Sequence, residues 1–308
     1  MPRDLGNLST SGGLAAILLW STTFALARSL SEQVGPITAA TTVYLVGGGL
    51  CLARLGFSKK GLTRVLRLPR RYLFGCGSLF VFYSAAIYMA VGLSNGRKQL
   101  LEIALLNYLW PALTILFSVP LLKKRASLWI IPGTVLALAG VFLVMTQDVS
   151  VSWASWRGHL QSRPAAYLLA LAAAISWGLY SNLARRWAGP EGDGAVELFV
   201  PVTGLVLLAL RLTVTEQTHW SLQALGEALA LAAITALGYV MWEAAMRRGN
   251  LLLVASCSYF TPLLSTFVSC IYLKVPPSPK LWIGCLLLVA GSLISWRSVK
   301  DRPVSTTP

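Results

Sequence analysis

The hydrophobic and polar positions of this chain alternate in long blocks. Apolar runs of about 20 residues recur along nearly the whole sequence, separated by breaks that are charged or rich in proline and glycine. A helix needs about 20 apolar residues to cross roughly 30 Å of hydrocarbon, and mid-bilayer there is no water to satisfy an open strand edge. The pattern predicts an all-α integral membrane protein with ten transmembrane helices, at residues 12–29, 37–55, 72–91, 99–121, 127–146, 164–186, 195–212, 225–246, 252–273 and 280–297.

The composition agrees with this membrane class. The 308 residues are 56% hydrophobic and 12% charged, with a mean hydropathy of +0.66, whereas soluble domains carry about 25% charged residues. A formal net charge of +15 raises the question of nucleic-acid binding. The basic residues lie between apolar runs and form no single basic face, so we expect the lipid bilayer as partner and no nucleic acid.

The distribution of basic residues predicts the orientation. Of the 26 Lys and Arg residues, 18 lie on the side shared by the N-terminus, the even-to-odd connections and the C-terminus. Cytoplasmic loops carry the excess of Lys and Arg. Both termini are therefore predicted to be cytoplasmic.

The first apolar run also has features of a signal peptide. Residues 14–24 are apolar, and Ala25-Leu26-Ala27 is similar to a cleavage site. However, the preceding segment carries only Arg3, balanced by Asp4, and the same pattern recurs deep in the chain. We expect a retained first helix.

The chain contains an internal repeat. A shift of 157 places Leu14-Ala15-Ala16, Trp20 and Leu26-Ala27-Arg28 on Leu171-Ala172-Ala173, Trp177 and Leu183-Ala184-Arg185. A shift of 151 places Tyr88, Arg97, Tyr108 and Pro111 on Tyr239, Arg248, Tyr259 and Pro262. Matched Trp, Tyr, Pro and Arg are uncommon by chance in membrane sequences, so two five-helix repeats are predicted, at residues 1–155 and 156–308.

Because five spans is an odd number, the second repeat must enter the membrane from the opposite side. The two repeats are then related by a pseudo-two-fold axis in the membrane plane. Transporters use this architecture and bind substrate near the midplane, between the repeats. The sequence therefore predicts a transporter.

Helical phase indicates which side chains face that site. Asn107, Trp110, Thr114 and Ser118 share one helix face, and their repeat mates Ser258, Thr261, Ser265 and Ser269 are also polar. Pro111 and Pro262 break the backbone hydrogen-bond ladder beside these faces. The predicted substrate-binding residues are Trp20, Thr23, Ser84, Tyr88, Glu102, Asn107, Tyr108, Trp110, Trp177, Tyr180, Tyr239, Trp242, Ser258 and Tyr259.

These residue types also have structural uses. Ser and Thr join membrane helices to one another, and Trp and Tyr mark the headgroup region. Glu102 and Glu243 are the acids clearly inside spans, where an acid is a functional hypothesis by default. Glu102 lies near the outer end of its span and Glu243 lies one turn from Arg247, so both also fit an interfacial role. No chain of buried acids indicates a proton relay.

The cysteines and histidines bear on whether the protein binds metal or forms disulfides. The five cysteines lie in apolar runs and the two histidines lie in polar connections, which indicates no disulfide framework, no metal site and no cofactor.

Gly133, Ala137 and Gly140 form a small-residue face, matched by Gly284 and Gly291. Such faces suit close packing within a monomer or in a weak homodimer.

The predicted lining favours a particular class of solute. Aromatic walls stack on flat apolar groups and attract ammonium ions. Hydroxyls, an amide and carbonyls freed by the kinks bind carboxylate and ammonium without fixed charge. The lining therefore predicts a zwitterionic or cationic solute and broad selectivity.

The chain resembles the drug/metabolite transporter (DMT) superfamily of the EamA type in two features that occur in both halves. The first is the proline kink, at Trp110-Pro111 and Thr261-Pro262. The second is the end of the kinked span, at residues 121–125 and 272–275, followed by a helix that contains glycine. Glu102-x4-Asn107-Tyr108-Leu109-Trp110-Pro111 is similar to the YddG-type aromatic amino-acid exporters of bacterial inner membranes. The usual Gly-Glu-Arg is absent, since Lys124-Arg125 and Lys274-Val275-Pro276 stand there, so no role of that glutamate transfers.

The resemblance implies two inverted five-helix repeats around a central cavity lined by the first, third and fourth helices of each. It also implies export of aromatic and other neutral amino acids by alternating access in a bacterial inner membrane. The alternatives are a carrier of quaternary-ammonium, drug-like, lipid or nucleotide-sugar solutes and a non-transporting membrane subunit. An intramembrane enzyme would need a catalytic cluster, and the sequence has none, so no enzyme is expected.

Overall fold

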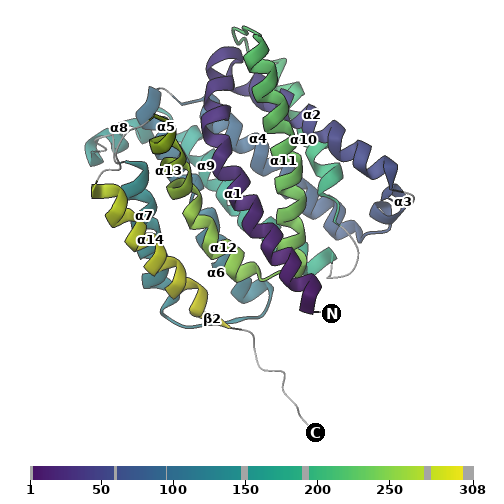
Figure 1. The fold of residues 1–308 in the computed structure, drawn as a ribbon. Helices are drawn as coiled ribbons and strands as arrows, with labels where there is room; N and C mark the ends of the chain where they lie inside the picture. Colours follow the sequence, from purple (N-terminus) through teal and green to yellow (C-terminus); the bar gives the residue numbers. More distant parts are fainter. Residues whose placement is uncertain are drawn as a thin grey trace.

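The computed structural model describes residues 3–58, 61–94, 96–146, 152–188, 194–273 and 279–300. Its described part is almost entirely helical (Figure 1). In the first half the helices are α1 (Arg3–Val34), α2 (Pro36–Phe57), α3 (Gly61–Leu66), the π-helical η1 (Arg71–Cys76), α4 (Gly77–Gly92), α5 (Gly96–Asn107), α6 (Trp110–Leu121) and α7 (Ile130–Met145). They are followed by α8 (Trp153–Ser162), α9 (Pro164–Ala188), α10 (Val196–Arg211), α11 (Leu222–Arg248), α12 (Leu251–Cys257), the 3-10 turn η2 (Ser258–Phe260), α13 (Thr261–Leu273) and α14 (Pro279–Arg297).

The ten apolar segments predicted from the sequence overlap these helices, but fewer than ten of the described helices are long and apolar enough to be counted as membrane spans. In the described part of the chain, six helical stretches are long and apolar enough to cross a membrane, and α1 makes a seventh when its two segments, which meet at 45°, are counted together. The six are Pro36–Phe57, Arg71–Gly92, Lys98–Leu121, Pro164–Ala188, Leu222–Arg248 and Pro279–Arg297. The chain is therefore a helical, multi-pass membrane protein.

Two predicted spans are interrupted at their prolines. The helix α5 ends at Asn107, and α6 begins at Trp110, one residue before Pro111. The repeat mate of this span passes through η2 before α13, which begins at Thr261, one residue before Pro262. Proline has no backbone N–H to donate and its ring clashes with the preceding turn, so the ladder breaks at these points.

The helices pack in four main pairs, and each pair joins one half of the chain to the other. The most extensive contacts are those of α1 with α11, α2 with α10, α4 with α9, and α7 with α14. Figure 1 shows that α1 begins at the end of the bundle where the short strand β2 (Val299–Lys300) follows α14. β2 pairs there with β1 (Arg125–Ala126), which precedes α7.

The predicted small-residue faces meet one another between α7 and α14. A Cβ placed on Gly140 would lie 2.7 Å from the Leu288 backbone nitrogen, and one on Gly291 would lie 2.3 Å from the Ala137 nitrogen. Both distances are too short for any side chain. The small residues therefore let these two helix backbones touch within a single chain.

Replacing Gly291 by valine is expected to destabilise the protein, because a side chain at this position must push α14 away from α7. Overpacking of this kind costs about 1–3 kcal/mol. Gly49→Val in α2 is the matched control, because a Cβ there meets no atom within 4 Å. Thermal unfolding in detergent should show a lower Tm for the Gly291 variant than for the Gly49 variant; equal values would contradict the packing described for α7 and α14.

Candidate functional site

Ten aromatic side chains in the middle of the bundle belong to one continuous network of ring contacts, which extends further through Phe199, 6.0 Å from Phe80, to Tyr72, 5.7 Å from Phe199. The ten side chains come from α1, α2, α4, α6, α9 and α11, and thus from both halves of the chain. This aromatic cluster consists of Trp20, Tyr44, Phe80, Tyr83, Tyr88, Trp110, Trp177, Tyr180, Tyr239 and Trp242. Trp177 and Trp242 are the largest fully or nearly fully buried side chains in it.

Trp177 lies at the centre of the aromatic cluster. Its ring centroid is 4.5 Å from that of Tyr83 and 5.2 Å from that of Tyr180. It is 5.9 Å from Trp242, with the two ring planes inclined by 30°, and 6.3 Å from Trp20. Ring pairs at about 4.5–7 Å are in direct, favourable contact. In this conformation the rings therefore pack on one another.

A glycine on α11 makes room for the first tryptophan. A Cβ on Gly238 would lie 2.6 Å from Trp20 Nε1, so any larger residue would displace the indole. The same helix carries Tyr239 and Trp242, whose rings lie 5.5 Å and 5.3 Å from that of Trp20. The close contact of α1 with α11 thus brings together aromatic residues far apart in the sequence.

Some polar groups of the cluster are paired and others are not. The Tyr44 hydroxyl lies 2.5 Å from that of Tyr239 and 3.2 Å from Ser84 Oγ. By contrast, the buried atoms Tyr180 Oη and Trp242 Nε1 have no hydrogen-bond partner among the described residues. Leaving a buried polar group unpaired costs about 1–3 kcal/mol. Such groups are uncommon in folded proteins, and both atoms can donate a hydrogen bond.

The structure brings most of the predicted site residues together. Those within the aromatic cluster or bonded to it are Trp20, Ser84, Tyr88, Trp110, Trp177, Tyr180, Tyr239 and Trp242. Asn107 lies beside them, with its side chain at the Tyr83 hydroxyl and its Oδ1 buried without a described partner.

Four predicted residues take other positions. The hydroxyls of Thr23 and Ser258 donate to backbone carbonyls of their own helices, at 2.7 Å (Trp20) and 2.8 Å (Val254). Tyr108 and Tyr259 pack at the breaks of the two interrupted helices, in the main hydrophobic core. The Tyr259 hydroxyl is buried and has no partner in the described part of the chain.

Three cluster residues were missed from the sequence: Tyr44, Phe80 and Tyr83. Phe80 lies one turn before Ser84 on the same face of α4, so helical phase alone would have found it. Tyr44 lies on α2 and has no aromatic repeat mate, since shifts of 151 and 157 lead to Ala195 and Pro201. The match between the two repeats therefore gives no signal at Tyr44.

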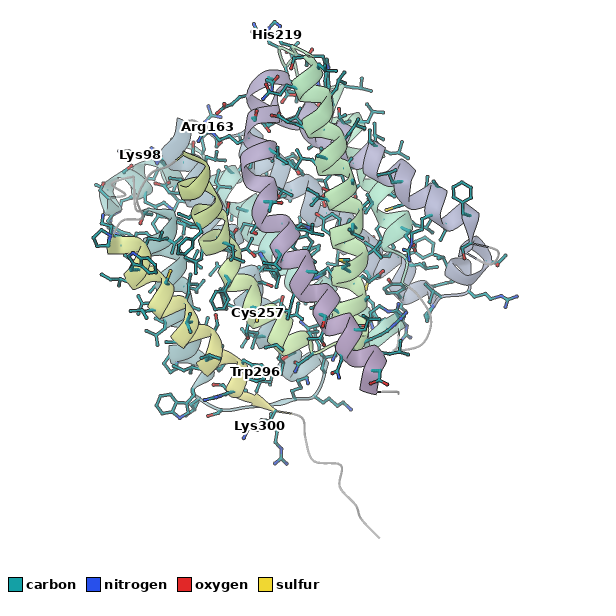
Figure 2. The ribbon with its side chains drawn as sticks, in the orientation of Figure 1. Lys98, Arg163, His219, Cys257, Trp296 and Lys300 are labelled. Carbon is teal, nitrogen blue, oxygen red and sulfur yellow. The ribbon has the colours of Figure 1, made fainter. Side chains whose placement is uncertain are left out.

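Glu102 lies apart from the aromatic cluster. It is 1% exposed, and its carboxylate accepts a hydrogen bond from the Tyr167 hydroxyl and lies 3.1 Å from His159 Nδ1. Lys98 and Arg163, one turn before Glu102 and Tyr167, lie at the end of the bundle opposite Lys300 (Figure 2). The Glu102–Tyr167 contact thus lies toward that far end.

Glu243 makes a similar contact toward the other end. It is 3% exposed, accepts a hydrogen bond from the Tyr72 hydroxyl, and accepts another from the backbone N–H of Val196 at 3.2 Å. The Arg247 guanidinium lies over the Tyr72 ring, 5.8 Å from its centroid. Just beyond the end of α11, the Asn250 N–H donates to Thr10 near the start of α1. The Glu243–Tyr72 contact therefore lies toward the end where α1 begins.

The chain is similar to known transporters along nearly its whole length. It is 32% identical over 289 residues to the aromatic amino acid exporter YddG of Escherichia coli, which covers 94% of this chain and 96% of that protein. It is 31% identical over 291 residues to a protein of the same name from Ancylobacter novellus, covering 92% and 95%. A solved crystal structure superposes with a TM-score of 0.77 at 28% identity, over 93% of this chain and 96% of the other.

The family comparison gives the broader assignment. The model of the EamA-like transporter family matches this sequence over two stretches, residues 9–146 and 164–297, which together make up most of the chain. The helical membrane fold and the match over both halves agree with each other. The chain belongs to the EamA-like transporter family.

Proposed function

We propose that this protein exports amino acids, aromatic and other neutral ones, by alternating access at the aromatic cluster. The observation that carries this proposal is a buried aromatic cluster, built from both halves, that retains polar atoms without partners in the described structure. The names of the similar exporters support the same solute class. The setting proposed is a bacterial inner membrane.

The proposed architecture has ten membrane-spanning helices in two inverted repeats, residues 1–155 and 156–308, with both termini in the cytoplasm. The helix pairing supports it. We number the spans one to five in the first half and six to ten in the second. A pseudo-two-fold axis would then carry α1 (span one) onto α9 (span six) and α11 (span eight) onto α4 (span three), so the pair α1–α11 would be carried onto the pair α9–α4. The pairs α2–α10 and α7–α14 would each be carried onto themselves. A pseudo-two-fold axis requires this behaviour, and the two separate family matches fit it.

The chemistry of the aromatic cluster suits an amino acid. The aromatic faces stack on a flat side chain and attract the substrate ammonium. Tyr180 Oη and Trp242 Nε1 are donors that can bind the carboxylate, since neither has a partner in the described structure. The ten cluster residues carry no fixed charge, so recognition rests on ring contact and neutral donors and tolerates different side chains.

The two Glu–Tyr contacts are proposed to close the two ends of the path. Each of them joins one half to the other: Glu102 and Tyr72 belong to the first half, Tyr167 and Glu243 to the second. In the described conformation both contacts are formed and the rings are packed. Breaking one contact while keeping the other would separate the halves at one end alone, which is the requirement of alternating access.

A competition assay tests the solute class. Purified protein in liposomes loaded with labelled phenylalanine should lose the label faster in the presence of other neutral amino acids on the far side, through exchange at a shared site. Tetraethylammonium is the comparison solute, because the aromatic cluster also attracts quaternary ammonium ions. Protein-dependent loss of label from liposomes loaded with labelled tetraethylammonium, with none from liposomes loaded with labelled phenylalanine, would contradict the proposal in favour of a quaternary-ammonium carrier.

A further inference from the structure

A basic pocket lies at the end of the bundle where β1 and β2 pair, well away from the aromatic cluster. It is an open depression of about 610 Å³ and is lined by Arg125, Arg297 and Lys300 together with Trp129 and Ile294. Pockets that hold small ligands measure roughly 300–1,000 Å³. The three cations come from two parts of the chain, β1 and the continuous stretch from the end of α14 to β2, and line one space.

The strand pairing places two of these cations in direct opposition. Arg125 is the antiparallel partner of Lys300, and the ladder is extended by the Ser127 N–H, which donates to the Ser298 carbonyl at 2.8 Å. Like charges directly opposite each other destabilise a strand pair. Within the described residues, no acidic side chain forms an ion pair with either of them. Among the residues that the structure describes, no negative charge offsets these two cations.

The surroundings of the pocket belong to a membrane interface. Trp129 is 67% exposed, which suits a tryptophan at headgroup level. Exposed apolar side chains continue from it: Leu128 in the turn before α7, Ile131 on α7 and Leu293 on α14. Figure 2 shows Trp296 and Lys300 close to each other at this end of the bundle. A ligand whose head is anionic and whose tail is apolar would match both parts of this surface.

We propose that the basic pocket binds the phosphate headgroup of an anionic phospholipid from the adjacent leaflet. The phosphate lies between Arg125, Arg297 and Lys300 and offsets their repulsion, and the acyl chains run along the exposed apolar faces of α7 and α14. The bound lipid ties the β1–β2 pair to the membrane surface. This inference depends on the membrane fold and not on which solute is transported.

The test measures thermal unfolding of the full-length protein in neutral detergent with added lipid. Phosphatidylglycerol should raise the Tm saturably by about 5 °C, as expected of a ligand that binds only the folded state. Phosphatidylcholine and inorganic phosphate should have much smaller effects, because one has no net negative charge and the other has no tail. An equal rise with inorganic phosphate would overturn the lipid assignment in favour of a free phosphate site.

Two variants locate the effect. Removing all three pocket cations (Arg125→Gln, Arg297→Gln, Lys300→Gln) should abolish the response to phosphatidylglycerol. The matched control removes three exposed cations near the start of η1, outside the pocket (Arg67→Gln, Arg70→Gln, Arg71→Gln), and should keep the response. Equal responses of the two variants would overturn the proposal.

A single substitution keeps the proposal testable if the triple variant does not fold. Arg125→Gln relieves the opposition with Lys300, so the lipid-free protein should keep or raise its Tm while its response to phosphatidylglycerol falls to less than half. A variant that loses stability without lipid and still responds fully would contradict the inference.

Discussion

Replacing Trp177 by alanine is expected to reduce amino-acid transport by at least about tenfold. This side chain contacts Tyr83, Tyr180 and Trp242 as well as Trp20, so its removal takes away the centre of the aromatic cluster. Loss of two or more aromatic or cation–π contacts, each contributing about 1 kcal/mol, lowers binding about tenfold or more. The measurement is the initial rate of phenylalanine efflux from proteoliposomes, at equal protein content.

Two further variants separate loss of the site from loss of the fold. Trp177→Phe retains a ring and should retain a large part of the transport. Trp282→Ala removes a tryptophan of α14 that is 54% exposed and lies outside the aromatic cluster, and it should transport normally. Trp177→Ala also leaves a cavity, which lowers the free energy of unfolding by about 3–5 kcal/mol. Monodisperse elution from a sizing column is therefore required of each variant. A folded Trp177→Ala protein with normal transport would remove the aromatic cluster from the mechanism.

Replacing Tyr72 by phenylalanine is expected to open one end of the protein. The substitution removes the hydroxyl that donates to the buried Glu243 carboxylate. A hydrogen bond to a charged group contributes about 1.5–3 kcal/mol, so the population open at this end should rise tenfold or more. Cys76 is a natural reporter, because it is fully buried one turn from Tyr72 and lies near Arg247 and Tyr180.

The reporter assay uses a protein in which Cys76 is the sole cysteine and follows its rate of labelling by a polar maleimide. Labelling should be about tenfold faster in the Tyr72→Phe variant. Tyr167→Phe is the matched control, since it breaks the equivalent contact with Glu102 at the opposite end and should leave the labelling of Cys76 unchanged or slower. If both variants label at the rate of the unmodified protein, the Glu–Tyr contacts do not control access.

The helices could be predicted from the sequence because membrane segments are defined by local composition. An uninterrupted apolar run has no alternative to a helix in lipid, and the breaks near Pro111 and Pro262 follow from the missing N–H of proline. α8 was not predicted, because Trp153–Ser162 is short and of mixed polarity, and its helix is stabilised by a Ser152 cap and by packing against α5 and α9.

The site was only partly predictable, for a related reason. Helical phase places Trp20, Trp177 and Trp242 on interior faces, which is a local property. The environment of Glu102 depends instead on where α8 and α9 lie, because its partners His159 and Tyr167 come from those helices. Likewise, Tyr44 reaches the cluster only because α2 packs near α4 and α11. Such contacts between distant segments leave no pattern in one sequence.

The most direct test of the central claim is the efflux of labelled phenylalanine from liposomes that contain the purified protein and have no imposed ion gradient. Transport at the aromatic cluster predicts efflux that is saturable, much faster than from protein-free liposomes, and slowed by excess unlabelled tryptophan loaded inside with the label. Efflux at the rate of protein-free liposomes, for phenylalanine and for every other neutral amino acid, would contradict the account.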